Sequence, residues 1–124
     1  MSKVLIVEDD LPTLKIYNEA FTKAGIGVRE FTSGDIPIAF MKSVDPDVIL
    51  LDIMLAGGKN GFDVLEDIKK DPDLKKIPVI MLTNLESEDV IAKKIGADDY
   101  LIKANISLDQ LVERVKKFLK SKKD

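Results

Sequence analysis

Residues 48–52 have the sequence VILLD, in which four aliphatic residues run directly into an acid. A short, unbroken aliphatic run of this kind is typical of a strand that is buried on both faces of a parallel sheet. The sequence AGGKNG at 56–61 supplies the turn signals that end the apolar stretch. Open α/β sheets bind ligands at the carboxyl ends of their strands, which is where Asp52 falls. Because a buried carboxylate is costly unless it is paired or metal-bound, we predict that Asp52 is the reactive centre.

Strand and helix patterns alternate five times along the chain. Each short aliphatic run is followed by apolar residues at helical spacing, and Gly, Pro or polar residues separate the elements. This alternation predicts an α/β fold with a doubly wound parallel sheet, five strands and five helices, and right-handed crossovers. We predict strands at 3–7, 28–31, 48–52, 77–82 and 100–102, and helices that open near Asp10, Ser33, Phe62, Ser87 and Ser107.

The last two predicted helices have inward faces that can be assigned from the spacing of their apolar residues. The final helix opens with a capping box, in which Ser107 and Gln110 would each bond to the backbone of the other. The predicted inward residues are Val90, Ile91 and Ile95 on the fourth helix, and Leu108, Leu111, Val112, Val115, Phe118 and Leu119 on the fifth.

The composition is that of a globular chain, and it excludes several kinds of chemistry. The 124 residues are 45% hydrophobic and 33% charged, which fits one domain spanning 1–124. The chain has no cysteine, so disulfides and thiolate chemistry are excluded. It has no histidine either, which removes the commonest general base and the commonest transition-metal ligand. Any metal is therefore expected to be a hard cation held by oxygens.

Charge and hydropathy argue against nucleic acids and membranes as partners. The net charge is −3, so we expect no direct binding to nucleic acid. No apolar run approaches the length of a membrane span, and the N-terminus lacks the basic and apolar regions of a signal peptide. We therefore expect a cytoplasmic protein with no membrane partner.

Acids, a hydroxyl or a lysine that could take part in chemistry stand at the ends of four of the predicted strands. The first strand ends in the acids at 8–10, the third in Asp52, the fourth in Thr83 and the fifth in Lys103. The carboxyl ends of parallel strands share one edge, so these acids would repel one another unless a cation lies among them. Mg²⁺ suits such carboxylates, and a lysine and a hydroxyl suit phosphoryl oxygens. Asp52 is then the best nucleophile, able to carry a phosphoryl group as an aspartyl phosphate.

Four segments of the chain occur in a specific order and spacing: VLIVEDD at 4–10, VILLDIML at 48–55, PVIMLT at 78–83 and GADDYLIK at 96–103. With these segments the chain resembles the response-regulator receiver domains of two-component signalling, in particular the single-domain chemotaxis regulators. The resemblance covers essentially all 124 residues. It implies a flavodoxin-like sheet with strand order 2-1-3-4-5.

The resemblance gives each residue at the predicted edge a role in phosphorylation. Asp52 would be the phosphoacceptor and also a ligand of Mg²⁺. Asp9 would bind Mg²⁺ directly and Glu8 through water, and the backbone carbonyl of Met54 would be a further protein ligand. The resemblance therefore implies a signalling switch that is controlled by phosphorylation and needs Mg²⁺.

The resemblance also implies a switch mechanism and its partners. Thr83 would hydrogen-bond a phosphoryl oxygen and move toward it, and Tyr100 would then turn inward. Lys103 would pair with the phosphoryl group, or with Asp52 before that group arrives. The output face would consist of the fourth helix, the fifth strand and the fifth helix. The donor would be a phosphohistidine on a sensor histidine kinase or a histidine phosphotransfer protein. A downstream protein target is expected, with the chain as a monomer or a phosphorylation-dependent dimer.

The chain departs from the usual family pattern at several positions. Ala104 follows Lys103 where family members usually have proline, so we expect a trans peptide bond or a strained one. Asn84 stands where a small residue is common, which would narrow access to the phosphoacceptor. Met54 and Leu85 occupy positions that tune hydrolysis in the family. Because both side chains are apolar and cannot position a water, we predict slow self-dephosphorylation.

Two other functions are compatible with some of these residues. A phosphatase or phosphotransferase that uses an aspartyl phosphate commonly has a second acid two residues after the nucleophile, and here that residue is Met54. A pseudo-receiver would bind partners without phosphorylation, but the set Asp9, Asp52, Thr83 and Lys103 argues against it. We therefore expect a protein that catalyses only its own phosphorylation and dephosphorylation and is not otherwise an enzyme.

Overall fold

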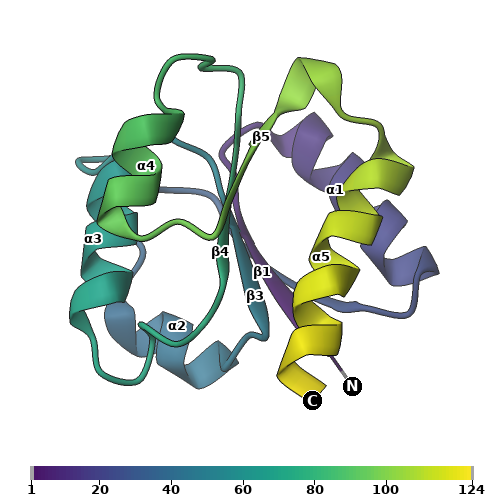
Figure 1. The fold of residues 1–124 in the computed structure, drawn as a ribbon, viewed down its shortest axis with the longest axis horizontal. Helices are drawn as coiled ribbons and strands as arrows, with labels where there is room; N and C mark the ends of the chain where they lie inside the picture. Colours follow the sequence, from purple (N-terminus) through teal and green to yellow (C-terminus); the bar gives the residue numbers. More distant parts are fainter. Residues whose placement is uncertain (1, 124) are drawn as a thin grey trace.

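A computed structural model describes the backbone of residues 2–123 and the side chains up to Leu119. These residues form a parallel sheet of five strands in the order β2-β1-β3-β4-β5, which confirms the predicted fold class and strand order (Figure 1). The neighbouring pairs are all parallel. The strands are β1 (Lys3–Val7), β2 (Gly27–Phe31), β3 (Val48–Leu51), β4 (Val79–Thr83) and β5 (Asp99–Ile102).

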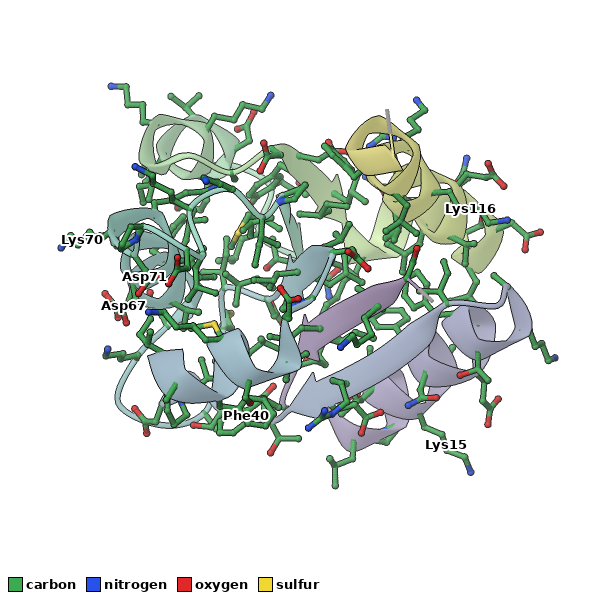
Figure 2. All side chains as sticks on the ribbon, turned by 90° about the horizontal axis from the view of Figure 1, so that it is seen from below. Lys15, Phe40, Asp67, Lys70, Asp71 and Lys116 are labelled. Atoms are coloured by element: carbon green, nitrogen blue, oxygen red, sulfur yellow. The ribbon has the colours of Figure 1, made fainter. Side chains whose placement is uncertain are left out.

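Five α-helices cover the two faces of the sheet. Helices α1 and α5 lie on one face, and α2, α3 and α4 lie on the other (Figure 1). Charged side chains such as Lys15, Lys70 and Lys116 project outward from these layers (Figure 2). The helices are α1 (Leu11–Lys23), α2 (Ile38–Val44), α3 (Gly61–Lys70), α4 (Asp89–Ile95) and α5 (Leu108–Lys123), and a short 3₁₀ helix, η1 (Lys103–Asn105), precedes α5.

The central strands are buried on both faces, as their uninterrupted aliphatic sequences predict. Successive side chains of a strand point to opposite faces, so β1 contributes to both cores. Val4 and Ile6 pack with α1 and α5, whereas Leu5 and Val7 pack with α2, α3 and α4. All four residues of β3 are buried. The strand that precedes Asp52 is therefore held firmly from both sides.

The sheet register brings the predicted site residues to one edge. Val7 lies opposite Leu51, and Thr83 lies opposite Ile102. Glu8 and Asp52 therefore leave the first and third strands side by side. Thr83 ends β4, and Lys103 follows β5 immediately.

Two loops at this edge are joined by close contacts. The N–H of Gly34 donates to the carbonyl of Ala56 at 2.8 Å, and the Ser33 hydroxyl donates to the same oxygen at 3.2 Å. Asp35 accepts from the N–H of Gly58 at 3.0 Å. A Cβ at Gly34 would lie 1.7 Å from the Lys59 carbonyl oxygen, so only glycine allows this approach. The loop after β2 and the loop after β3 thus act as one unit.

The start of α2 differs from the prediction that Ser33 caps it. The helix begins at Ile38, after Pro37 in an extended conformation, and Pro37 makes no side-chain hydrogen bond that would cap it. A residue before proline is disfavoured in the α region, which keeps Ile36 out of the helix. The one predicted capping box is confirmed at α5, where Ser107 and Gln110 exchange hydrogen bonds of 2.9 and 3.1 Å.

Three residues that were predicted to point inward are exposed instead. Val90 is 60% exposed, Ile91 49% and Leu108 40%. Helix α4 has only seven residues and begins at Asp89, and its buried side is formed by the small residue Ala92. The apolar spacing on a helix this short does not decide which side faces the sheet, so the prediction for Val90 and Ile91 was wrong.

We predict that Gly61→Ala lowers the free energy of unfolding by about 1–3 kcal/mol, the usual cost of overpacking. A Cβ at this position would lie 2.1 Å from the carbonyl oxygen of Asp52 and 2.6 Å from Cα of Ile53. Both contacts are with backbone, so the segment that carries Asp52 must shift. Urea denaturation measures the loss.

The matched control is Gly58→Ala in the same loop. Its Cβ would meet only the Asp35 carboxylate, at 3.3 Å, and that side chain can move. The control should change the unfolding free energy by no more than about 0.5 kcal/mol. Equal losses in the two variants would contradict the role given to the Gly61 contact.

Candidate functional site

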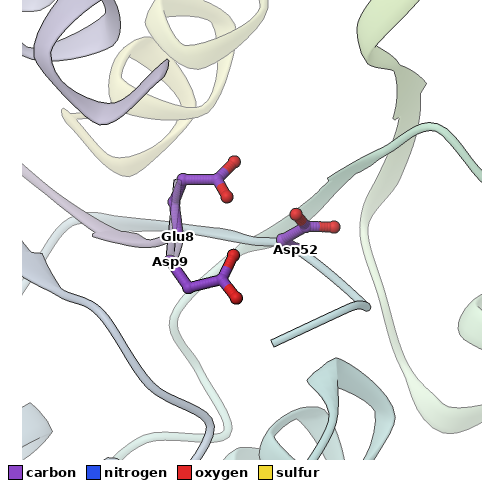
Figure 3. Close-up of side chains that lie close together, drawn as sticks. All are labelled: Glu8, Asp9 and Asp52. Carbon is purple, nitrogen blue, oxygen red and sulfur yellow. The ribbon is translucent and has the colours of Figure 1, made fainter. Parts of the chain in front are cut away.

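Three carboxylates meet at the carboxyl edge of the sheet. Glu8 and Asp9 follow β1, and Asp52 follows β3. Each offers an oxygen within 4.8 Å of the others. Figure 3 shows the three side chains gathered close together. Glu8 and Asp52 are buried, whereas Asp9 is exposed. Buried carboxylates at this spacing need a positive charge nearby, because like charges repel strongly where solvent is excluded.

Lys103 supplies that charge from the end of β5. Its Nζ donates to Oδ2 of Asp52 at 2.7 Å and also to Oε1 of Glu8. The Lys103 side chain is only 17% exposed. One ammonium therefore bridges two buried carboxylates that come from different strands. The pairing with Asp52 was predicted, but the pairing with Glu8 was not.

The electrostatics of this bridge follow from burial and pairing. Burial raises the pKa of Glu8, and its hydrogen bond from Lys103 offsets only part of the effect. Burial acts to lower the pKa of Lys103, but the hydrogen bonds to Asp52 and Glu8 outweigh it, so the pKa is raised overall. The ammonium thus keeps its proton at neutral pH.

Backbone N–H groups orient the same carboxylates. Oδ1 of Asp52 accepts from the N–H of Ile53 at 2.7 Å, and the second oxygen of Glu8 accepts from Asp10 at 3.2 Å. Asp9 accepts from the N–H of Ala56 at 3.0 Å, so the loop after β3 reaches back to the first strand. No side-chain pattern in the sequence signals the Ala56 contact, because every residue except proline carries a backbone N–H.

The two predicted switch residues converge on Leu85. Thr83 is buried at the end of β4, and its hydroxyl accepts from the N–H of Leu85 at 3.4 Å. The Tyr100 hydroxyl donates to the carbonyl of the same residue. Burial raises the pKa of Tyr100, and the nearby carboxylates of Glu88 and Asp89 add to this rise. Thr83 thus lies at the predicted edge, and its hydroxyl bonds within its own loop.

Met54 lies two residues beyond Asp52 and has an exposed side chain. Together with Phe62 and Leu85 it lines an open depression that reaches Asp9. The Met54 N–H lies 3.4 Å from Oδ1 of Asp52. Metal binding by the Met54 carbonyl stays a prediction.

Asn84 makes a contact that the sequence did not reveal. Its Oδ1 accepts from the N–H of Ala104 at 3.2 Å. The described residues contain no cis peptide bond, so the Lys103–Ala104 bond is trans, one of the two geometries expected. The Asn84 side chain therefore links the segments that follow β4 and β5, just beyond the last residue pair of these strands.

The arrangement suits phosphoryl chemistry. Carboxylate oxygens at this spacing suit a hard cation such as Mg²⁺, and the exposed Asp9 leaves a way in from solvent. The partly buried ammonium beside Asp52 can neutralise the charge on a transferred group. The family model described as the response regulator receiver domain matches residues 4–116. The chain belongs to this family.

Solved receiver structures resemble this receiver domain over nearly its whole length. The BeF3-activated receiver domain of Klebsiella pneumoniae RstA is 28% identical with a TM-score of 0.86, covering 95% of this chain and 98% of that one. The Mn²⁺-bound response regulator Rcp1 is 30% identical with a TM-score of 0.79, covering 96% and 94%. The phosphorylated cyanobacterial phytochrome response regulator RcpA is 31% identical with a TM-score of 0.76, covering 94% and 89%.

Among the described residues, no helix combines the length and apolar character that crossing a membrane requires.

We predict that Lys103→Met lowers the free energy of unfolding by about 3–5 kcal/mol at neutral pH in chelator, because two buried carboxylates lose their shared cation. The loss should shrink as the pH falls. Burial already raises the pKa of Glu8, so its protonation as the pH falls removes one of the two charges. Urea denaturation at several pH values measures both effects.

Lys42→Met is the matched control, since the Lys42 ammonium pairs with Asp71 and Asp73 at the surface. Its effect should be much smaller than that of Lys103→Met and should not reproduce the recovery at low pH. A loss for Lys103→Met that stays constant as the pH falls would argue against the bridge as the cause.

Proposed function

We propose that the receiver domain, residues 1–124, is a phosphorylation-controlled signalling switch. It accepts a phosphoryl group from a phosphohistidine on a sensor histidine kinase or a histidine phosphotransfer protein, with Asp52 as the acceptor. The observation that carries the proposal is the Lys103 ammonium, which hydrogen-bonds to both Asp52 and Glu8 at the edge where the acids gather. The chain has no histidine of its own, so the histidine of the relay belongs to the partner.

In the proposed transfer, a carboxylate oxygen of Asp52 attacks the phosphorus of the partner's phosphohistidine. A new P–O bond forms as the P–N bond breaks, and the electron pair of that bond stays on the partner's imidazole. Oδ2 is the better candidate, because Oδ1 is engaged by the backbone of Ile53 whereas Oδ2 faces Lys103. The Lys103 ammonium can then pair with the phosphoryl oxygens, and the Thr83 hydroxyl can donate a hydrogen bond to one of them.

Mg²⁺ is the proposed cofactor. Glu8, Asp9, Asp52 and the carbonyl of Met54 would hold it, with Glu8 acting through water. When bound, the ion would neutralise charge on the phosphoryl oxygens. The oxygen-only donors fit a hard cation, and the related response regulator Rcp1 has a Mn²⁺-bound form.

Switching is proposed to run through Leu85. Movement of Thr83 toward the phosphoryl group would shift Leu85, whose N–H and carbonyl bond to Thr83 and Tyr100. Tyr100 would then lose its present partner and turn inward, which changes the face formed by α4, β5 and α5. A downstream protein would read that face through a shift in population between two states.

The proposed switch acts on itself and turns over no external substrate. Residue 54 is methionine, so the site lacks the second acid expected of a phosphatase with this chemistry. We further propose that the domain acts in the cytoplasm, as a monomer or a phosphorylation-dependent dimer. A pseudo-receiver that only binds partners is the alternative.

Incubation with acetyl phosphate and Mg²⁺ should add one phosphoryl group to the protein, as seen by intact mass. The gain should be absent without Mg²⁺ and in Asp52→Ala, because the first lacks the charge neutralisation and the second lacks the nucleophile. The Ser87→Ala variant, altered away from the acids, should match the unmodified chain. If neither phosphoryl nor beryllofluoride binds, the pseudo-receiver alternative is favoured.

Self-dephosphorylation should be slow, with a phosphoryl lifetime well beyond seconds. Met54 and Leu85 line the depression that reaches Asp9 with apolar groups that cannot orient a water. Met54→Asn should speed hydrolysis about tenfold, which corresponds to about 1.4 kcal/mol in the barrier. Phosphate release from the purified phosphoprotein measures the rate.

Ile16→Asn on α1 is the control for an added amide on the exposed surface. It should leave the lifetime unchanged. A lifetime of seconds in the unmodified chain would contradict the role given to Met54 and Leu85.

A further inference from the structure

We infer that Asn84 is a positioning residue for phosphoryl transfer, because its side-chain oxygen holds the turn that carries Lys103. The inference rests on the proposed function of Asp52 and adds a residue to its machinery. It starts from the hydrogen bond between Oδ1 of Asn84 and the N–H of Ala104, at 3.2 Å.

The bond lies just beyond the end of the sheet. Thr83 and Ile102 form the last residue pair between β4 and β5. The pairing of β4 with β5 ends at these two residues, so it does not hold the backbone of Lys103 in place. The Asn84 side chain bonds to Ala104 instead. It therefore adds a side-chain link where the backbone ladder stops.

The donor at Ala104 is available because of the local helix. The first N–H groups of a helix have no partner within it and need an outside acceptor. Helix η1 starts at Lys103, and Ile102 before it provides no side-chain acceptor. Asn84, the residue that follows β4, thus caps the start of η1 with its side-chain oxygen. Proline at position 104 would have no N–H to donate, so Asn84 and Ala104 function as a matched pair.

The backbone of Lys103 is consequently fixed on both sides. Ile102 is held by the sheet, and Ala104 is held by Asn84. With this support the Lys103 Nζ lies 2.7 Å from Asp52. Without Asn84 the turn at 103–105 loses its link to β4, and the ammonium spends less time on the acceptor.

The same residue could instead act only as an obstacle in front of Asp52. The two roles predict opposite changes in the rate of phosphorylation when Asn84 is replaced by alanine. An obstacle that is trimmed to alanine lets a small donor in faster. A positioning residue that is trimmed to alanine slows the transfer, because Lys103 is less well placed to neutralise the phosphoryl charge.

The first measurement is the reactivity of Lys103 toward acetic anhydride, read lysine by lysine by peptide mass spectrometry on the folded protein. In Asn84→Ala the labelling of Lys103 should rise about threefold to tenfold, the size expected for one lost hydrogen bond, with the other lysines unchanged. Asn84→Asp keeps the acceptor oxygen and should label like the unmodified chain.

Two further variants complete the test. Ala104→Pro removes the donor and should raise Lys103 labelling by a similar factor, and adding Asn84→Ala to it should cause no further rise. Ser87→Ala is the matched control, because its hydroxyl makes no hydrogen bond among the described residues, and its labelling should not change. Unchanged Lys103 labelling in Asn84→Ala, or a rise shared by all lysines, would overturn the inference.

The second measurement is the rate of phosphorylation by acetyl phosphate with Mg²⁺. Asn84→Ala should be about threefold to tenfold slower, on the same basis. A faster rate would overturn the inference in favour of the obstacle. If the unmodified chain takes up neither a phosphoryl group nor beryllofluoride, the proposed function fails, and Lys103 labelling still decides the role of Asn84 on its own.

Discussion

The ammonium of Lys103 binds two buried carboxylates that belong to different strands of the sheet. Glu8 and Asp52 sit side by side because β1 and β3 are neighbours in register, and their charges would repel without the lysine. The bridge connects β5, at one edge of the sheet, with the two strands at its centre. Removing a cation from such a site leaves uncompensated buried charge, so the stability of the fold and the proposed chemistry depend on the same contact.

Much of this arrangement could be predicted from the sequence. Unbroken aliphatic runs signal strands buried on both sides, and parallel strands must deliver the residues that follow them to one edge. That reasoning placed Asp52 beside Glu8 and Asp9, and brought Lys103 to the same place. The alternation of elements gave the fold class, because strands joined by helices have few ways to pack. The roles of these residues in phosphoryl transfer remain predictions.

Two kinds of structural feature could not be predicted from the sequence. The first is packing on short elements: Val90 and Ile91 fit an inward stripe, yet α4 is too short for spacing to fix its rotation, and both are exposed. The second is bonding by backbone groups. The N–H of Ala56 on Asp9 and the N–H of Ala104 on Asn84 have no signature in residue type. In the second case the sequence shows only that residue 104 is not proline, and the geometry is needed to show that Asn84 accepts from its N–H.

The contact between the loops after β2 and β3 limits how such domains can be recombined. Gly34 and Ala56 bond to each other, and a Cβ at Gly34 would collide with the carbonyl of Lys59. Ala56 in turn bonds to Asp9, which lies beside the proposed phosphoacceptor Asp52. A chimera that exchanges only the loop after β3 with that of a relative would therefore lose the contacts between the two loops. Transplanting both loops together preserves these contacts, so residues 33–35 and 54–60 form the natural unit of exchange.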